Sequence, residues 1–335
     1  MAWDGPPPAP RPTPSPSGAD RPGGATPAPR FFARSSFWNA SLGRDAALDP
    51  RSDRLAAELR RQVDREREQR NGPWIATSQY STPIYTVPAR QRTVRVKLDT
   101  YTPSKLQSAF AAVPIPRGAR PAAGRDAHLT VWQPSRDRMW EFWRLARRSD
   151  GWHASWGGAM RDVSRSPGHY TKASWPGAEP YWGSTASKLP VVGGTVTIEE
   201  LERGRIDHAL ALGVPKVRAE YVSSPAQRTD GTVRSADAIP QGARFRLDPD
   251  LDLSALDLPP ITRMLAEAAQ RHGMVVRDRS GTVAFYAEDP APRRTNPYPE
   301  LIGPLYYPDN INEATARFPW EHVELLRMDL HRQER

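Results

Sequence analysis

The residues between His128 and Gly158 include the types that do acid–base chemistry beside a sugar. The segment holds five of the eleven tryptophans of the chain, two of its seven histidines and the carboxylate Glu141. A carboxylate beside an imidazole can exchange protons with a bound substrate, and tryptophan rings pack against sugar faces. The same side chains would also fill the core of an aromatic β-sandwich. The segment therefore has two interpretations, a glycan site and a structural core.

The turn at 134–137 sets the pairing of the two strands in this segment. If Gln133 and Arg138 close the turn, His128 and Glu141 project to the same sheet face, because alternate strand residues point to opposite faces. A slip of one residue would turn Glu141 to the other face. The alternation therefore predicts that Glu141 and His128 are neighbours, and they are the first catalytic candidates.

The next turn decides where a second histidine lies. Residues 149–151 suit a three-residue loop that ends in a left-handed glycine, with Arg148 opposite Trp152. His153 would then lie about 20 Å from Glu141, at about 3.3 Å per strand residue. We therefore keep His153 as a substrate-binding candidate rather than a catalytic one.

The remaining candidates follow from what each reaction needs. A glycoside hydrolase needs two carboxylates about 5–10 Å apart. A polysaccharide lyase needs a base, an acid, and an arginine or glutamine that neutralises a uronate carboxyl. The histidine in the segment IDHALAL would share a strand face with apolar residues, which is more typical of a core residue. The catalytic candidates are Glu141, His128, His208, Asp126, Asp207 and Tyr221. The substrate-binding candidates are Trp132, Trp143, His153, Trp175, Trp182, Gln227, Arg228 and Arg244.

Several other kinds of chemistry are not indicated. The chain has no cysteine, which excludes disulfides, zinc–thiolate sites and cysteine nucleophiles. It has no nucleophile-elbow, zincin, phosphate-loop or dinucleotide motif. Histidine spacing gives no strong metal site. We therefore expect neither a cofactor nor a metal.

The elements that must position these residues are mostly strands. Many short strands with few helices favour a mostly β fold of β-sandwich or jelly-roll type with a few peripheral helices. The predicted strands are 84–87, 93–98, 127–133, 138–146, 152–160, 206–212, 216–222 and 243–247, with a final hairpin of 274–277 and 282–287. The predicted helices are 52–70, 104–112, 260–272 and 320–330.

The ends of the chain indicate its organisation. Residues 1–30 contain ten prolines and predict a disordered linker, whereas residues 31–335 predict a single β-rich globular domain. No apolar signal-peptide segment and no run of 18 apolar residues is present, so we expect a mature form without a transmembrane segment. Such linkers often hold extracellular domains, so we expect a secreted or cell-surface protein.

The charge balance bears on partners. The formal net charge is +9 and the mean hydropathy −0.67. Basic residues are spread along the chain among Asp and Glu, and no nucleic-acid motif occurs, so we expect no nucleic-acid partner. A basic surface favours an anionic polymer such as a cell-wall or uronic-acid glycan. An arginine-rich genome would give the same composition.

Several segments resemble a family of secreted bacterial β-rich proteins with no established activity. They are GRDAHLTVWQP, MWEFW, GWHASWGGAM, GSTASKLPVVGG, ELERGRIDHALALGVP, GARFRL and AAQRHGMVVRDRSG. The resemblance covers most of 31–330. It implies an exported β-rich domain, and it implies no role for any particular residue.

These observations favour an extracellular glycan-active protein. The first hypothesis is a carbohydrate-degrading enzyme, a glycoside hydrolase or a polysaccharide lyase, acting on a cell-wall or environmental polysaccharide. The alternative is a non-catalytic glycan- or cell-wall-binding surface module, with the tryptophans as its platform. A structural surface domain is a third hypothesis. The glycan, its linkage and the oligomeric state stay open.

Overall fold

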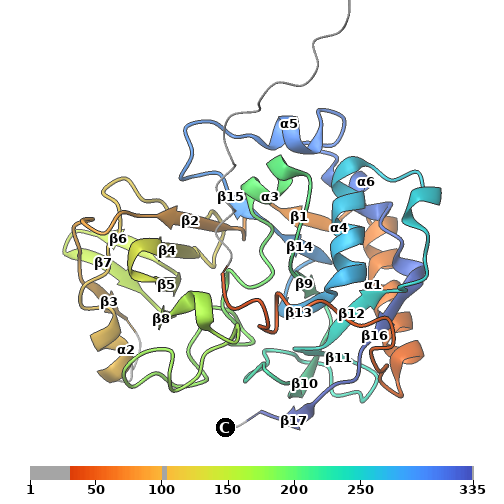
Figure 1. Cartoon of the computed structure of the whole chain (residues 1–335), viewed down its shortest axis with the longest axis horizontal. Helices are drawn as coiled ribbons and strands as arrows, with labels where there is room; N and C mark the ends of the chain where they lie inside the picture. The colour runs from red at the N-terminus through yellow and green to blue at the C-terminus, as the bar shows by residue number, and fades with distance from the viewer. Residues whose placement is uncertain (1–30, 100–103, 334–335) are drawn as a thin grey trace, which may run out of the picture.

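The computed structural model describes residues 31–99 and 104–333. The predicted linker at 1–30 lies outside the described residues. Within them the chain forms 17 strands in four sheets, together with a few helices (Figure 1). The predicted β-rich fold is therefore confirmed. The β-sandwich or jelly-roll type is not confirmed, because the sheets mix parallel and antiparallel pairs.

Two larger sheets form the body of the molecule. The six-stranded sheet has the order β1 (Trp74–Ala76), β14 (Ala284–Tyr286), β9 (Leu210–Val214), β13 (Met274–Arg279), β12 (Arg244–Leu247) and β16 (Val323–Leu325). The five-stranded sheet has the order β15 (Glu288–Asp289), β2 (Thr82–Thr86), β4 (Leu129–Gln133), β5 (Arg138–Trp143) and β8 (Trp156–Arg161).

Smaller sheets and helices complete the fold. The two three-stranded sheets have the orders β11 (Ile239–Gln241), β10 (Val217–Ser223), β17 (Leu330–Arg332) and β3 (Val96–Leu98), β7 (Gly151–Ala154), β6 (Ala146–Arg148). The α-helices are α1 (Ser52–Glu68), α2 (Ser104–Ala109), α3 (Ile198–Arg203), α4 (Pro260–Arg271), α5 (Tyr298–Ile302) and α6 (Ile311–Ala316). The 3-10 turns are Pro134–Arg136, Val163–Arg165, Leu253–Ala255 and Trp320–His322.

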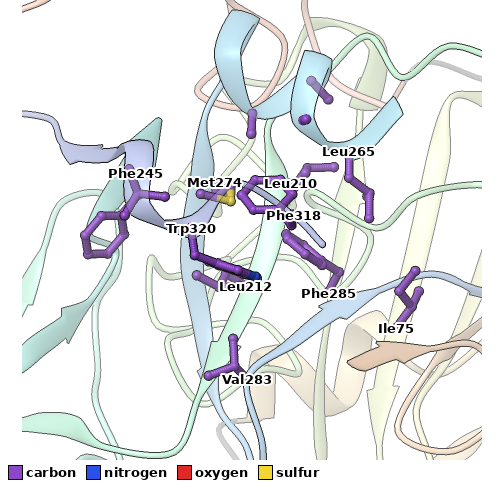
Figure 2. Close-up of a cluster of buried hydrophobic side chains, with 14 of the residues drawn as sticks. Ile75, Leu210, Leu212, Phe245, Leu265, Met274, Val283, Phe285, Phe318 and Trp320 are labelled. Atoms are coloured by element: carbon purple, nitrogen blue, oxygen red, sulfur yellow. The ribbon is translucent and has the colours of Figure 1, made fainter. Parts of the chain in front are cut away.

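Helices cover one face of the six-stranded sheet. Helix α1 contacts β16, α4 contacts β12 and β9, and α6 contacts β1 (Figure 1). Met274 and Phe285 point into the apolar core between the sheet and these helices (Figure 2). The alternating residues Val275 and Tyr286 belong to separate buried clusters on the other face. That face therefore packs against the rest of the chain.

Strand β13 carries a β-bulge between Val276 and Asp278. Val276 pairs with Leu212, and the next pair joins Asp278 to Gly213, so β13 has one extra residue. Bulges re-aim side chains and occur beside active sites. A Cβ atom at Gly213 would lie 2.6 Å from the Tyr286 hydroxyl, so only glycine lets this tyrosine lie across β9.

The β4–β5 hairpin has the predicted register. Gln133 pairs with Arg138 and Thr130 with Glu141. The turn is a 3-10 turn that ends in Asp137, whose φ of 49° is left-handed. The prediction that His128 and Glu141 share a face is confirmed, since both contact the same residue of a later loop.

The following turn differs from the predicted one. Arg148 pairs with Gly151 and Arg147 with Trp152, so the turn has two residues and the predicted three-residue loop is wrong by one position. The left-handed φ of 54° at Arg144 also ends β5 early. The strand predicted at 138–146 is interrupted for this reason. The strand predicted at 152–160 is interrupted between β7 and β8, and His153 lies in a different sheet from Glu141.

Two later predictions are wrong for non-local reasons. Strands β13 and β14 do not form the predicted hairpin, because β9 lies between them and pairs with both. The helix predicted at 320–330 is a single 3-10 turn followed by β16 and β17. Strand β16 forms because β12 offers an edge, on which Phe245 pairs with Leu325.

Candidate active site

The loop 183–195 lies against the five-stranded sheet through a buried carboxylate. Glu141 is fully buried and accepts hydrogen bonds from the backbone N–H of Ser184 at 2.6 Å and of Val191 at 2.8 Å. The Ser184 hydroxyl also donates to it, and Nε2 of His128 lies 3.1 Å from the Ser184 carbonyl oxygen. Burial raises the pKa of Glu141 to about 7, although these hydrogen bonds oppose the shift. Both predicted residues therefore hold this loop.

A buried cation holds the same loop from the six-stranded sheet. Arg277, 1% exposed, donates through Nη1 to the carbonyl oxygen of Val191, to that of Gly193 at 2.9 Å and to the Thr195 hydroxyl at 2.9 Å. Its guanidinium carbon lies 4.3 Å from the ring centroid of Tyr286. The loop is therefore fixed by one charge from each larger sheet.

Lys188 lies in this clamped loop. Its φ of 67° is left-handed, a conformation that non-glycine residues rarely adopt and that is found most often at functional sites. Its Nζ lies 4.5 Å from the ring centroid of Trp156 and makes no hydrogen bond or ion pair with the residues that the structure describes. Desolvation lowers the pKa of Lys188 to about 8, and the nearby Arg228 adds to the shift. An ammonium of this kind can give up its proton near neutral pH.

Asp278 supplies the second titratable group. Its Oδ1 accepts one long hydrogen bond of 3.3 Å from the backbone N–H of Ala186, and its Oδ2 has no hydrogen-bond partner in the described part of the chain. Burial raises the pKa of Asp278 to about 7, and the like charges of Asp230 and Asp126 act in the same direction. The charges of Asp278 and Lys188 also interact. These two half-buried groups keep polar atoms available for a substrate.

Aromatic rings lie beside Lys188. Trp143 and Trp156 are paired across β5 and β8, and both are half-buried. Nε1 of Trp143 donates to Oδ1 of Asp126 at 2.9 Å. The ring of Tyr181, 42% exposed, lies 6.4 Å from that of Trp156. Rings of this kind offer flat apolar faces beside polar groups, which is what a sugar ring requires.

We name this assembly the Lys188 cluster. It consists of Asp126, His128, Glu141, Trp143, Trp156, Tyr181, Lys188, Arg228, Arg277, Asp278 and Tyr286. Of the sequence candidates it contains two carboxylates, a histidine, a tryptophan and an arginine. The backbone N–H of Gln227 donates to the Ser187 carbonyl oxygen at 3.0 Å, which joins that candidate to the same loop.

Other sequence candidates lie elsewhere. Trp132 and Trp182 are buried in the core, and Trp175 packs edge-on against Trp140.

The polar candidates outside the cluster have partners of their own. His153 lies between two carboxylates, Asp99 at 2.7 Å and Asp150 at 2.9 Å. Tyr221 stacks under Arg218, and Arg244 donates to backbone carbonyls of Phe37 and His272. None of these belongs to the Lys188 cluster.

His208 lines a separate cavity of about 210 Å³ together with Asp207 and Glu200. It lies before β9, which begins at Leu210, so the predicted strand 206–212 misplaced it. Its Nδ1 faces the carbonyl oxygen of Ala209 at 2.9 Å, and its Nε2 faces Glu200 at 3.0 Å. Both ring nitrogens therefore donate, and the resulting imidazolium has no lone pair with which to accept a substrate proton.

This pair predicts a pH-dependent contribution to stability. The pKa of His208 is raised by Glu200, and that of Glu200 is lowered by His208. The histidine contribution is complete below 6.5 and is lost as pH rises through the raised folded pKa, whereas the Glu200 contribution is lost as pH falls below 4.5. We expect His208→Asn to lower the melting temperature most near pH 5.5 and least at alkaline pH, above the raised folded pKa, measured by calorimetry. An equal loss at both pH values would show that no ion pair is formed.

Sequence reasoning missed the residues at the centre of the Lys188 cluster. Lys188, Arg277 and Asp278 were not candidates, and neither was Trp156. One signal was available, because Arg277 and Asp278 directly follow the apolar residues 274–276 within the same strand, MVVRDR. A charge at a buried strand position needs a partner and marks a candidate functional site.

The described residues offer neither a clustered metal site nor a membrane-spanning helix. Among residues 31–99 and 104–333, no three or more His, Asp or Glu side chains are grouped so that they could hold a metal ion. No helix in the described residues has the length and apolarity that crossing a membrane requires.

Comparison of the chain with known proteins assigns it to no family. The resemblance to the secreted bacterial family stays a prediction. No protein-family model matches the chain, and neither a curated protein nor a solved structure matches it.

Proposed function

We propose that this chain is an extracellular enzyme that cleaves an acidic polysaccharide at the Lys188 cluster, by elimination. One observation carries the proposal. Lys188 and Asp278 are both half-buried, have polar atoms free among the described residues and are close enough for their charges to interact, and Lys188 lies beside Trp156, which pairs with Trp143. A proton donor, a proton acceptor and a sugar-binding surface are thereby available at one place.

The proposed reaction assigns a role to each group. Lys188, as the neutral amine, removes the proton on the carbon next to the uronate carboxyl. The bond to the glycosidic oxygen breaks, a carbon–carbon double bond forms, and Asp278 gives its proton to the departing oxygen. Arg228, which is exposed and close enough for its charge to affect Lys188, neutralises the substrate carboxylate. A base that is not a carboxylate favours elimination over hydrolysis.

Hydrolysis is the second candidate reaction. It would use Asp278 as the acid and Asp126, whose charge acts on Asp278, as the second carboxylate. Binding without turnover is the remaining candidate, with the aromatic rings as the platform.

A substrate panel separates these functions. The full chain is incubated with polygalacturonate, alginate, peptidoglycan and a neutral dextran, and both new reducing ends and the ultraviolet absorbance of unsaturated uronates are measured. Elimination gives both signals with an acidic glycan. Reducing ends without absorbance would replace elimination by hydrolysis. Retention on a glycan column without either signal would leave a binding module, and no retention would contradict all three functions.

The exposed ring of Tyr181 gives a prediction on binding. We expect Tyr181→Ala to weaken glycan affinity by about 2- to 10-fold, because one aromatic stacking contact contributes about 0.5–1.5 kcal/mol. Its melting temperature should stay within about 1 °C of the parent, since the side chain is 42% exposed. Trp182→Ala is the matched aromatic control, because that ring is fully buried and its loss should destabilise the fold without contacting a ligand. Titration calorimetry measures the affinity. Unchanged affinity in Tyr181→Ala would remove this ring from the binding surface.

A further inference from the structure

A second pocket, outside the Lys188 cluster, is lined by positive charge. It has a volume of about 490 Å³, and its lining includes Arg90, Arg92, Arg117 and Arg147. No aspartate or glutamate lines it. All four arginines are exposed. The pocket therefore concentrates positive charge with no acidic side chain around it to balance that charge.

These four arginines differ from others in the molecule. Many arginines in the described residues pair with carboxylates, as Arg148 does with Asp99 and Arg279 with Asp230. None of the four pocket arginines forms an ion pair within residues 31–99 and 104–333. Arg147 and Arg148 are adjacent in β6, so their side chains leave opposite faces of the strand. Arg148 forms an ion pair with Asp99, whereas Arg147 lines the pocket.

Three separate segments build the pocket. Arg90 and Arg92 lie in the loop that follows β2, Arg117 lies before β4, and Arg147 lies in β6. The sheet β3–β7–β6 lies at the outer edge of the molecule, away from the six-stranded sheet that carries Arg277 (Figure 1). Like charges repel, so a chain that gathers four guanidinium groups without counter-charges is expected to have an anionic partner.

The geometry favours a glycan over a nucleic acid as that partner. Proteins that bind single-stranded nucleic acid stack bases on exposed aromatic rings. The one aromatic residue in this lining, Trp152, is 5% exposed, and the Arg147 guanidinium already lies 5.6 Å from its ring centroid. The pocket therefore offers charge without a stacking surface. Guanidinium groups bind carboxylates with two parallel hydrogen bonds, which suits acidic sugars repeated along a chain.

We propose that this pocket is a second, non-catalytic binding site for an acidic polysaccharide, whose carboxylates contact Arg90, Arg92, Arg117 and Arg147. The inference rests on the proposed function for its choice of glycan and extends it, because it assigns a site where the polymer is held away from the Lys188 cluster. Held at this site, a long chain would stay bound between successive cleavages.

The test measures binding separately from turnover. Titration calorimetry of the full chain with polygalacturonate oligomers at low and high salt compares the parent protein with the double variant Arg90→Gln/Arg117→Gln. We expect the double variant to bind roughly 3- to 10-fold more weakly, because each exposed guanidinium–carboxylate contact contributes about 0.2–1 kcal/mol. Its affinity should also depend less on salt. Arg234→Gln is the charge-matched control, since Arg234 is exposed and lies outside the pocket, and it should change affinity less than 2-fold.

Two results would overturn this proposal. The first is equal affinity of the parent and the double variant for polygalacturonate. The second is binding of an oligothymidine that the double variant loses while polygalacturonate binding persists, which would make the partner a nucleic acid. Failure of the proposed function is a different result, because it would leave binding at this pocket intact with no product formed.

Discussion

Asp278→Asn is expected to lower kcat for glycan cleavage by about 10²- to 10⁴-fold, the usual contribution of a general acid or base. Asparagine keeps the shape of the side chain and can still accept the hydrogen bond from Ala186, but it cannot donate a proton to the leaving oxygen. KM should change by less than about 3-fold, because the side chain acts in the transition state and not in substrate binding. Initial rates with the substrate found in the panel measure both constants.

The same variant should fold as well as the parent or better. Burial raises the pKa of Asp278 from 3.8 to about 7, so the folded protein resists losing a proton that the unfolded chain loses readily. The parent therefore loses stability as pH rises from about 3.8 to about 7, and the asparagine variant escapes this loss. We expect an equal or higher melting temperature for Asp278→Asn at pH 8. Asp309→Asn is the control, since that carboxylate is exposed, and it should retain full activity.

The pH profile gives an independent reading of the two groups. Lys188 must be neutral and Asp278 protonated at the same time, and their pKa values are about 8 and about 7. The fraction of enzyme in this state is greatest between these values, so kcat/KM should be bell-shaped with its maximum near pH 7.5. A profile without a limb in this range, or full activity in Asp278→Asn, would remove this pair from the mechanism.

The parts of the fold that were predictable from the sequence are local. Helices α1 and α4 follow from apolar spacing and from Pro260 at the first helical position. The β4–β5 register follows from a short turn and strict alternation. The prediction of a β13–β14 hairpin was wrong for a non-local reason. Strand β9 lies between the two strands, although it is some sixty residues earlier in the chain. No local pattern shows which strand will occupy an intervening position.

The candidate site was predictable only in part for a related reason. Glu141 and His128 were found because one hairpin positions both. Lys188 and Asp278 are distant in sequence, and they lie close enough for their charges to interact only because the loop 183–195 is held between two sheets. The bulge in β13 also breaks the strict alternation from which the face of Asp278 would have been assigned. Long-range clamping and a register shift are tertiary features, so the sequence pattern indicated a polar site without locating its centre.

The clamp itself depends on Arg277. Its Nη1 satisfies the carbonyl oxygens of Val191 and Gly193 and the hydroxyl of Thr195, all of them in the loop that carries Lys188. Its charge also lowers the pKa values of Glu141 and Asp278, which burial raises. The residue therefore links the stability of the loop to the protonation of the site, and it acts as a positioning residue.

Arg277→Met should accordingly change both properties. We expect the free energy of unfolding to fall by about 2–4 kcal/mol, because several buried acceptors lose their donor, and this is measured by urea denaturation. With the positive charge gone, the pKa of Asp278 should rise, so the limb of the pH–rate profile assigned to that carboxyl should move to higher pH.

Arg246→Met is the matched control for this prediction. Arg246 is also buried in the six-stranded sheet, where it pairs with Glu324 at 2.9 Å and donates to two backbone carbonyls, but it does not touch the loop 183–195. It should cost similar stability and leave the pH profile unchanged. Identical pH profiles for both variants would mean that Arg277 stabilises the fold without tuning the site.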